Sequence, residues 1–122
     1  MKFLIVDDMY TNRLRIKVIL KNLGYTSDEA IDGVDAFNKV KENDYDIVLM
    51  DVEMPRMNGF ETLQCIREEL PANKKNTPVI MISSHGTFSF FRDFDKYGYN
   101  AIITKPFTEE KFINVLSSVV NI

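Results

Sequence analysis

The sequence contains very few of the side chains that cross-link small domains or bind zinc. Its 122 residues include one cysteine, Cys65, and one histidine, His85. A single cysteine cannot form an intramolecular disulfide, and a zinc site needs a larger set of cysteine and histidine ligands. We therefore expect Cys65 to be an ordinary helix residue and we do not expect a zinc site.

The chain also lacks a long apolar run and an excess of positive charge. No apolar run approaches the roughly 18 residues that a membrane-spanning helix needs. The apolar start of the chain leads directly into Asp7 and Asp8, where a secretory signal peptide would have small residues. The formal net charge of −3 gives no general electrostatic attraction to nucleic acid or to membranes. We expect a cytoplasmic protein that binds neither of them directly.

The composition is that of one soluble globular domain. Hydrophobic residues make up 45% and charged residues 27% of the chain. A chain of this length buries about two thirds of its unfolded surface, and no repeat or linker divides it. We expect one domain over residues 1–122. The start at Met1 and an end directly after the last predicted helix favour a stand-alone protein over a piece of a longer one.

Four short apolar runs each lead into polar residues. Such runs, rich in β-branched residues, are typical of central strands in a parallel sheet that is covered on both faces. The runs and the polar residues that follow them are 3–6 with Asp7 and Asp8, 47–50 with Asp51, 79–82 with Ser83 and Ser84, and 101–103 with Lys105 and Pro106. Ligands bind outside the carboxyl ends of such strands, so these groups should share one crevice.

Segments with helical periodicity separate the strands. We expect helices over 12–23, 33–43, 59–70, 87–97 and 108–120, an edge strand over 25–30 and polar loops over 51–58 and 71–78. Gly24 caps the first helix, and Val34, Phe37 and Val40 lie on the apolar face of the second. Strict alternation of strand and helix predicts a flavodoxin-like (βα)5 doubly wound parallel sheet of order 2-1-3-4-5, with helices on both faces.

The polar residues at the strand ends suit phosphoryl chemistry. Three carboxylates in one crevice raise one another's pKa unless a cation lies among them, and ligands that are all oxygen favour Mg²⁺. The Lys105 ammonium and the Ser83 hydroxyl could bind a dianionic phosphoryl group opposite that ion. Attack of Asp51 on phosphorus would then give an acyl phosphate.

Three segments together resemble the receiver domain of two-component response regulators. They are Val6-Asp7-Asp8, the segment MDVEMPRMNG over 50–59, and Thr104-Lys105-Pro106-Phe107, and the resemblance covers the whole chain. It implies that Asp51 is phosphorylated by a histidine kinase or, in a phosphorelay, by a histidine phosphotransfer protein.

The resemblance also implies roles for the residues around Asp51. Asp8 would bind Mg²⁺ directly, Asp7 would help through water, and Glu53 would contribute its backbone carbonyl. Ser83 stands at the position of the switch hydroxyl and Lys105 at that of the family's site lysine. The Lys105–Pro106 peptide bond would be cis. Ser84 in place of a small residue, commonly alanine, is accommodated without strain.

The expected output is a change of shape. Phosphorylation would shift the surface formed by the helix over 87–97, the strand at 101–104 and the last helix, toward an unidentified downstream protein. Many relatives carry an aromatic switch residue where this chain has Ile102. Phe88 and Phe91 are either extra core or part of a partner surface. We expect a monomer or a weak phosphorylation-dependent dimer.

Simpler or rival interpretations exist for each motif. Asp7 and Asp8 could cap a helix, Ser83 could be an ordinary strand-end hydroxyl, and His85 could be solvated near the mouth of the site. Gly59 is expected to supply a permissive turn and helix start rather than a phosphate contact. The chain is expected to be a signalling phosphoacceptor rather than an enzyme. Self-catalysed phosphorylation and dephosphorylation are compatible with this expectation. The rivals are a Mg²⁺-dependent phosphatase with Asp51 as nucleophile and a binding module that is not phosphorylated.

Overall fold

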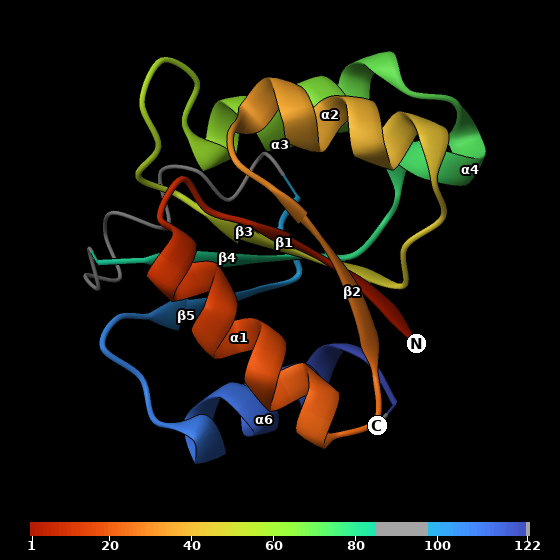
Figure 1. Cartoon of the computed structure of the whole chain (residues 1–122). Helices are drawn as coiled ribbons and strands as arrows, with labels where there is room; N and C mark the ends of the chain where they lie inside the picture. The colour runs from red at the N-terminus through yellow and green to blue at the C-terminus, as the bar shows by residue number, and fades with distance from the viewer. Residues whose placement is uncertain (85–97, 122) are drawn as a thin grey trace.

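Alternating strands and helices build a five-stranded parallel sheet of order β2-β1-β3-β4-β5 (Figure 1). The computed structural model describes residues 1–84 and 98–121. The strands are β1 Lys2–Val6, β2 Thr26–Ala30, β3 Ile47–Asp51, β4 Val79–Ser83 and β5 Ala101–Thr104, and the helices are α1 Tyr10–Asn22, α2 Gly33–Glu42, α3 Gly59–Glu69, α4 Ala72–Lys75 and α6 Glu109–Val119. The predicted fold class and strand order are confirmed.

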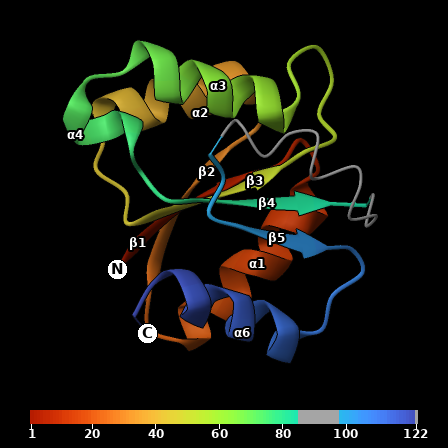
Figure 2. The same ribbon diagram turned by 180° about the vertical axis from the view of Figure 1, so that it is seen from behind.

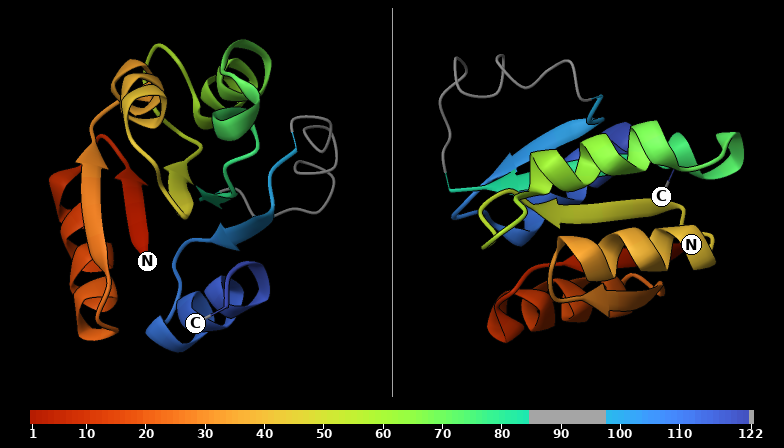
Figure 3. Two further views of the ribbon diagram at one scale, coloured as in Figure 1. Left: turned by 90° about the vertical axis from the view of Figure 1, so that its right-hand side faces the viewer. Right: turned by 90° about the horizontal axis from the view of Figure 1, so that it is seen from above.

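Helices cover both faces of the sheet, so the described part of the chain has three layers. Helices α1 and α6 lie on one face, and α2 and α3 lie on the other (Figures 1 and 2). The left view of Figure 3 shows the sheet between these two helical layers. Because successive strand residues point to opposite faces, Leu4 and Val6 join the core beneath α2 and α3, while Phe3 and Ile5 join the core beneath α1 and α6.

The sequence specifies where several helices begin. The Asn58 side chain accepts from the Glu61 amide and the Glu61 side chain accepts from the Asn58 amide, which forms a capping box at the start of α3. The Asp32 side chain caps α2, and the Thr108 side chain caps α6. Gly24 follows α1 with φ of +87°, as expected for a glycine at the end of a helix.

One residue of a predicted helix face and one predicted loop differ from the structure. Val34 is 59% exposed, because the buried positions of α2 are Gly33, Ala36 and Val40, and Val34 lies about 100° around the helix from that stripe. The loop over 71–78 contains α4, whose turn forms when the Lys74 and Lys75 amides donate to the Pro71 carbonyl. Proline favours a helix start because it has no amide hydrogen to satisfy.

The remaining predicted helices that lie within the described residues agree with the structure within a few residues. Helix α1 starts two residues earlier than the apolar stripe suggested, and its buried residues are Ile16, Ile19 and Leu20. The predicted helix over 87–97 lies outside the described residues, as do His85, Phe88 and Phe91. Among the described residues, no helix is both long enough and apolar enough to cross a membrane.

Candidate functional site

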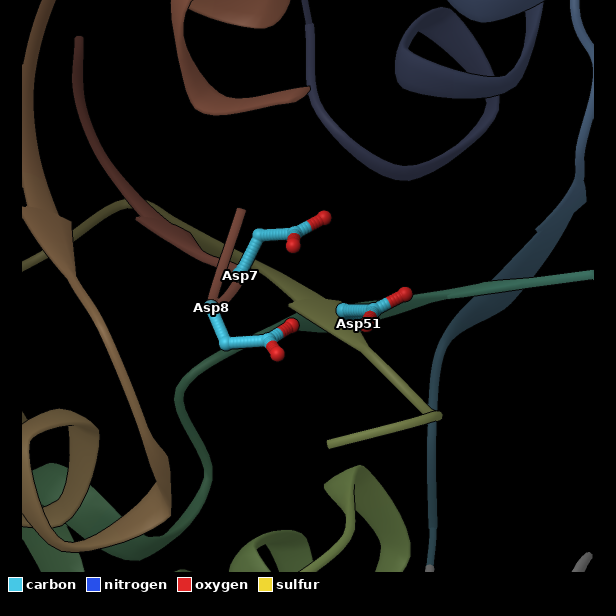
Figure 4. A group of neighbouring side chains, drawn as sticks. All are labelled: Asp7, Asp8 and Asp51. Atoms are coloured by element: carbon cyan, nitrogen blue, oxygen red, sulfur yellow. The ribbon is translucent and has the colours of Figure 1, made fainter. Parts of the chain in front are cut away.

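Parallel pairing brings three acidic side chains together at the carboxyl edge of the sheet. Val6 pairs with Met50, so Asp7 and Asp8 follow β1 beside Asp51 at the end of β3. Figure 4 shows the three carboxylates beside one another at these strand ends. One carboxylate oxygen from each lies within 4.8 Å of the others. Asp7 and Asp51 are each only 3% exposed, whereas Asp8 is exposed to solvent.

Lys105 places a positive charge beside Asp51 and Asp7. Its Nζ donates to Asp51 Oδ1 over 2.8 Å and lies 3.6 Å from Asp7 Oδ2. The Lys105 backbone amide donates to the Ser83 carbonyl over 2.8 Å, which continues the pairing of β4 with β5 and brings the lysine to the site. The Lys105–Pro106 bond is cis, as predicted.

Burial and charge shift the protonation equilibria of this pair. Burial raises the pKa of Asp51 to about 6, with Asp7 and Glu53 adding to the rise and the Lys105 hydrogen bond and charge opposing it. Burial also disfavours the charged form of Lys105, but the Asp51 hydrogen bond and the charges of Asp51, Asp7 and Glu53 outweigh it and raise the Lys105 pKa. The site is therefore short of positive charge when its carboxylates are ionised.

Asp7 is held by the turn that follows β1. Its Oδ1 accepts from the Met9 amide over 2.9 Å, and its backbone carbonyl accepts from Arg13 Nη1 over 2.8 Å. Met9 is the N-cap residue of α1 and makes no side-chain capping hydrogen bond. The alternative of Asp7 or Asp8 as the N-cap of this helix is therefore wrong. The turn leaves Asp7 Oδ2 directed at Lys105.

Gly59 is required by close packing rather than by a special backbone angle. A Cβ at this position would collide with the Asp51 carbonyl oxygen and would lie 2.8 Å from Met81 Cε and 3.0 Å from Val52 Cα. The Gly59 amide donates to the Val52 carbonyl over 2.9 Å. The predicted helix start at Gly59 is confirmed, because α3 begins there. Glycine is needed because it lets α3 start directly against the end of β3, and not because of a positive φ.

The Glu53 side chain makes a contact that the sequence did not suggest. Its Oε1 accepts from Ser83 Oγ and from the Ser84 amide, each over 2.8 Å. Ser83 is fully buried and Ser84 is exposed. Glu53 entered the prediction only through its backbone carbonyl, although an acidic residue two positions after Asp51 can reach the neighbouring strand end.

A cavity of about 410 Å³ lies beside Asp7 and Lys105. The residues that line it come from the ends of β1, β4 and β5 and from α1, and they are Asp7, Asn12, Arg15, Ile16, Ser84, Lys105, Pro106 and Phe107. Arg15 Nη2 donates to the Phe107 carbonyl, and its guanidinium lies 4.4 Å from the centre of the Phe107 ring. Sequence reasoning missed Asn12 and Arg15, which no motif marks.

The other predicted site residues lie in different surroundings. Pro106 is exposed at the cavity, and Ile102 is half-buried and packs against the core beneath α2 and α3. His85, Phe88 and Phe91 lie outside the residues that the structure describes, so their predicted positions stay predictions.

The donor set fits a hard divalent cation. Asp7, Asp8 and Asp51 offer only oxygen ligands, and two of the three carboxylates are buried beside Lys105. Such a set suits Mg²⁺, which is bound through one or two carboxylates with several waters retained. Burial is the main cause of the raised Asp51 pKa, and a bound cation would relieve the repulsion by Asp7 and Glu53 that adds to it.

Comparisons with known proteins agree with this geometry. The family model described as response regulator receiver domain matches residues 3–117. The chain is 40% identical over 111 residues to chemotaxis protein CheY-3 of Vibrio cholerae, covering 88% of this chain and 82% of that protein.

Two solved structures match the fold closely. The CheX–CheY–BeF3–Mg complex from Borrelia burgdorferi gives a TM-score of 0.89 at 34% identity, over 98% of this chain and 88% of the other. The receiver domain of sensor histidine kinase PA1611 from Pseudomonas aeruginosa, with magnesium coordinated in its active-site cleft, gives 0.85 at 25% identity, over 97% and 95%. Proteins of this fold have thus been solved with magnesium, in one of these two cases in the active-site cleft of that protein.

Proposed function

The chain belongs to the response regulator receiver domain family, and from this we propose that it is a signalling phosphoacceptor that carries a phosphoryl group on Asp51. The observation that carries the proposal is the 2.8 Å hydrogen bond from Lys105 Nζ to Asp51 Oδ1 beside the Asp7 and Asp8 carboxylates. Receiver domains are phosphorylated by histidine kinases or phosphotransfer proteins. We infer that residues 1–122 form one such domain and act in the cytoplasm with a partner of this kind.

The transfer needs a carboxylate nucleophile and a means to hold the phosphoryl group. An oxygen of Asp51 attacks phosphorus, the new P–O bond forms as the P–N bond to the donor imidazole breaks, and the imidazole leaves with the electron pair. Since the pKa of Asp51 is about 6, the carboxylate is mostly ionised at neutral pH. The Lys105 ammonium can then pass from the carboxylate to the phosphoryl oxygens.

Asp7, Asp8 and Asp51 would hold Mg²⁺, and the Glu53 backbone carbonyl is proposed as a further ligand. When bound, the ion would neutralise charge on the carboxylates and on the phosphoryl oxygens. Asp8 is the exposed member of the set and is proposed to bind directly, whereas buried Asp7, already engaged with Met9, helps through water.

Signal output is proposed to begin at Ser83 and Lys105. Phosphorylation replaces the single negative charge of the Asp51 carboxylate with about −1.5 to −2 on the phosphoryl group, and both groups gain contacts that the unmodified protein lacks. Only such differential contacts can shift a conformational equilibrium. Their movement would change the surface that includes β5 and α6, which a downstream protein would recognise.

Labelling with a small phosphodonor tests the proposal. With Mg²⁺ present, we expect one phosphoryl group per chain, located on Asp51 by mass spectrometry, and no labelling of Asp51→Asn. Asp46→Asn, an exposed carboxylate whose Oδ2 accepts from the Lys2 amide, is a control that should label normally. Full labelling of Asp51→Asn would refute the assignment. Sustained turnover of phosphomonoesters would favour the phosphatase instead, and no labelling would favour the binding module.

A further inference from the structure

One carboxylate oxygen of Glu53 accepts from two hydrogen-bond donors at the end of β4. Oε1 accepts from Ser83 Oγ and from the Ser84 amide, each over 2.8 Å. Glu53 follows β3 and Ser83 ends β4, so this contact ties together the segments that follow two neighbouring strands. The same two segments flank Asp51.

The Ser83 hydroxyl cannot serve two acceptors at once. A hydroxyl has a single proton to donate. In the present arrangement that proton is directed to the Glu53 carboxylate. Ser83 is fully buried, so the hydroxyl has no free exchange with solvent in this state. A phosphoryl oxygen on Asp51 could gain this donor only after the bond to Glu53 breaks.

We propose that the Glu53 side chain is an internal competitor for the phosphoryl group, holding Ser83 and Ser84 in the resting arrangement until Asp51 is phosphorylated. The inference rests on Asp51 as phosphoacceptor and on Ser83 as a donor to the phosphoryl group. It assigns to Glu53 a positioning role that is separate from its backbone carbonyl, because side-chain substitutions leave the carbonyl in place.

The competition sets how readily the chain switches. Each bond to Oε1 stabilises the resting state but not the phosphorylated state, so it moves the equilibrium toward rest. Hydrogen bonds to a charged acceptor are stronger than neutral ones. A shorter or neutral side chain at position 53 should therefore make the phosphorylated arrangement easier to reach.

Binding of beryllofluoride with Mg²⁺, a mimic of the phosphoryl group, gives a direct measurement. We expect Glu53→Ala to bind it at least roughly tenfold more tightly than the parent, the lower end of the effect that one hydrogen bond to a charged acceptor gives. Glu53→Asp is the matched control for charge, because it keeps the carboxylate but is one methylene too short to reach Ser83. It should show a gain of similar size.

A double substitution shows whether Glu53 acts through the hydroxyl. In a Ser83→Ala background, Glu53→Ala should gain clearly less than in the parent, since the donor is already gone. An equal gain in both backgrounds, a gain with Glu53→Ala but not with Glu53→Asp, or no gain at all would overturn the proposal. The first two results would assign the effect to charge repulsion alone. Mg²⁺ affinity is measured for each variant so that a change in metal binding is not mistaken for competition.

The resting contact has its own measurement that does not depend on phosphorylation. In the unmodified protein, hydrogen exchange at the Ser84 amide should be faster in Glu53→Ala than in the parent, because that amide donates to Oε1. Unchanged exchange would refute the contact itself. If Asp51→Asn labels normally while the Ser84 amide exchanges faster in Glu53→Ala, the phosphoacceptor assignment is wrong but the contact between Glu53 and Ser84 is confirmed.

Discussion

The middle of β3 and its last residue differ sharply although they are neighbours. Ile47, Val48, Leu49 and Met50 are apolar and fully buried, whereas Asp51 is an equally inaccessible carboxylate. Burial of the first four stabilises the fold through the hydrophobic effect. Burial of Asp51 opposes its charged form, and the Lys105 hydrogen bond and charge offset this only in part. The strand interior therefore supports the fold, while the strand end holds a reactive group at the expense of stability.

Truncation in the strand interior should give the largest loss of stability. Leu49 is fully buried in the core shared with Ile5 and Ile80 beneath α1 and α6. We expect Leu49→Ala to lower the free energy of unfolding by roughly 2–5 kcal/mol, from lost transfer energy and a cavity. Urea denaturation measures this. Val18→Ala, at a residue 48% exposed on α1, is the control and should change stability by less than about 0.5 kcal/mol.

Substitution at the end of the same strand should act in the opposite direction. Because the folded-state pKa of Asp51 is about 6 and the unfolded value is 3.8, the folded state binds more protons between these values. Its stability then falls as pH rises from about 4 to 6. Asp51→Asn cannot ionise, so without Mg²⁺ we expect it to be more stable than the parent by roughly 1–3 kcal/mol at pH 7, reduced by the loss of the Lys105 contact.

The pH profile distinguishes this effect from a general change in packing. The stability difference between Asp51→Asn and the parent should be small near pH 4 and should grow to its full value above pH 6. Urea unfolding in the presence of a chelator, repeated across this range, checks the sign. A difference that stays constant with pH, or a less stable Asp51→Asn at pH 7, would contradict the raised pKa.

The sequence was sufficient to predict the sheet and the cluster of acidic residues, because both follow from local patterns. Short apolar runs mark central strands, and strand order brings their ends together. The contacts of side chains in the connecting segments follow no repeating sequence pattern. Arg67 shows this: its guanidinium donates to the carbonyls of Lys75 and Thr77 and to that of Gly98, contacts that depend on where three separate segments meet.

The contacts of the Glu53 side chain were not predicted, for the same physical reason. Its distance in sequence from Asp51 was plain, but the rotamer that carries its carboxylate to Ser83 depends on the path of the chain after β3. Val34 illustrates the opposite error, since a good apolar residue lay one position away from the buried stripe of α2. Periodicity predicts a face to within about one residue, and a single step rotates a helical side chain by about 100°.

Two glycines offer a smaller test of how tightly the strand end is packed. Gly59→Ala introduces a Cβ against the Asp51 carbonyl and should cost roughly 1–3 kcal/mol through displacement of the start of α3. Gly24→Ala meets nothing within 4 Å, so only its φ of +87° opposes alanine, at about 1 kcal/mol. Only Gly59→Ala should also slow phosphodonor labelling, because it displaces Asp51. Equal labelling rates in the two variants would show that the site tolerates this displacement.

Asp7 and Asp8 should differ in how much each contributes to Mg²⁺ affinity, because their surroundings differ. Asp8 is exposed, whereas Asp7 is buried, accepts from the Met9 amide and faces Lys105. If Asp8 binds Mg²⁺ directly and Asp7 acts through water, Asp8→Asn should weaken Mg²⁺ binding about tenfold, or about 1.4 kcal/mol, and Asp7→Asn less. Isothermal titration of each variant measures the difference. A larger loss in Asp7→Asn would reverse the assignment. A metal bound directly by Asp7 would have to displace Lys105 from the Asp7 carboxylate.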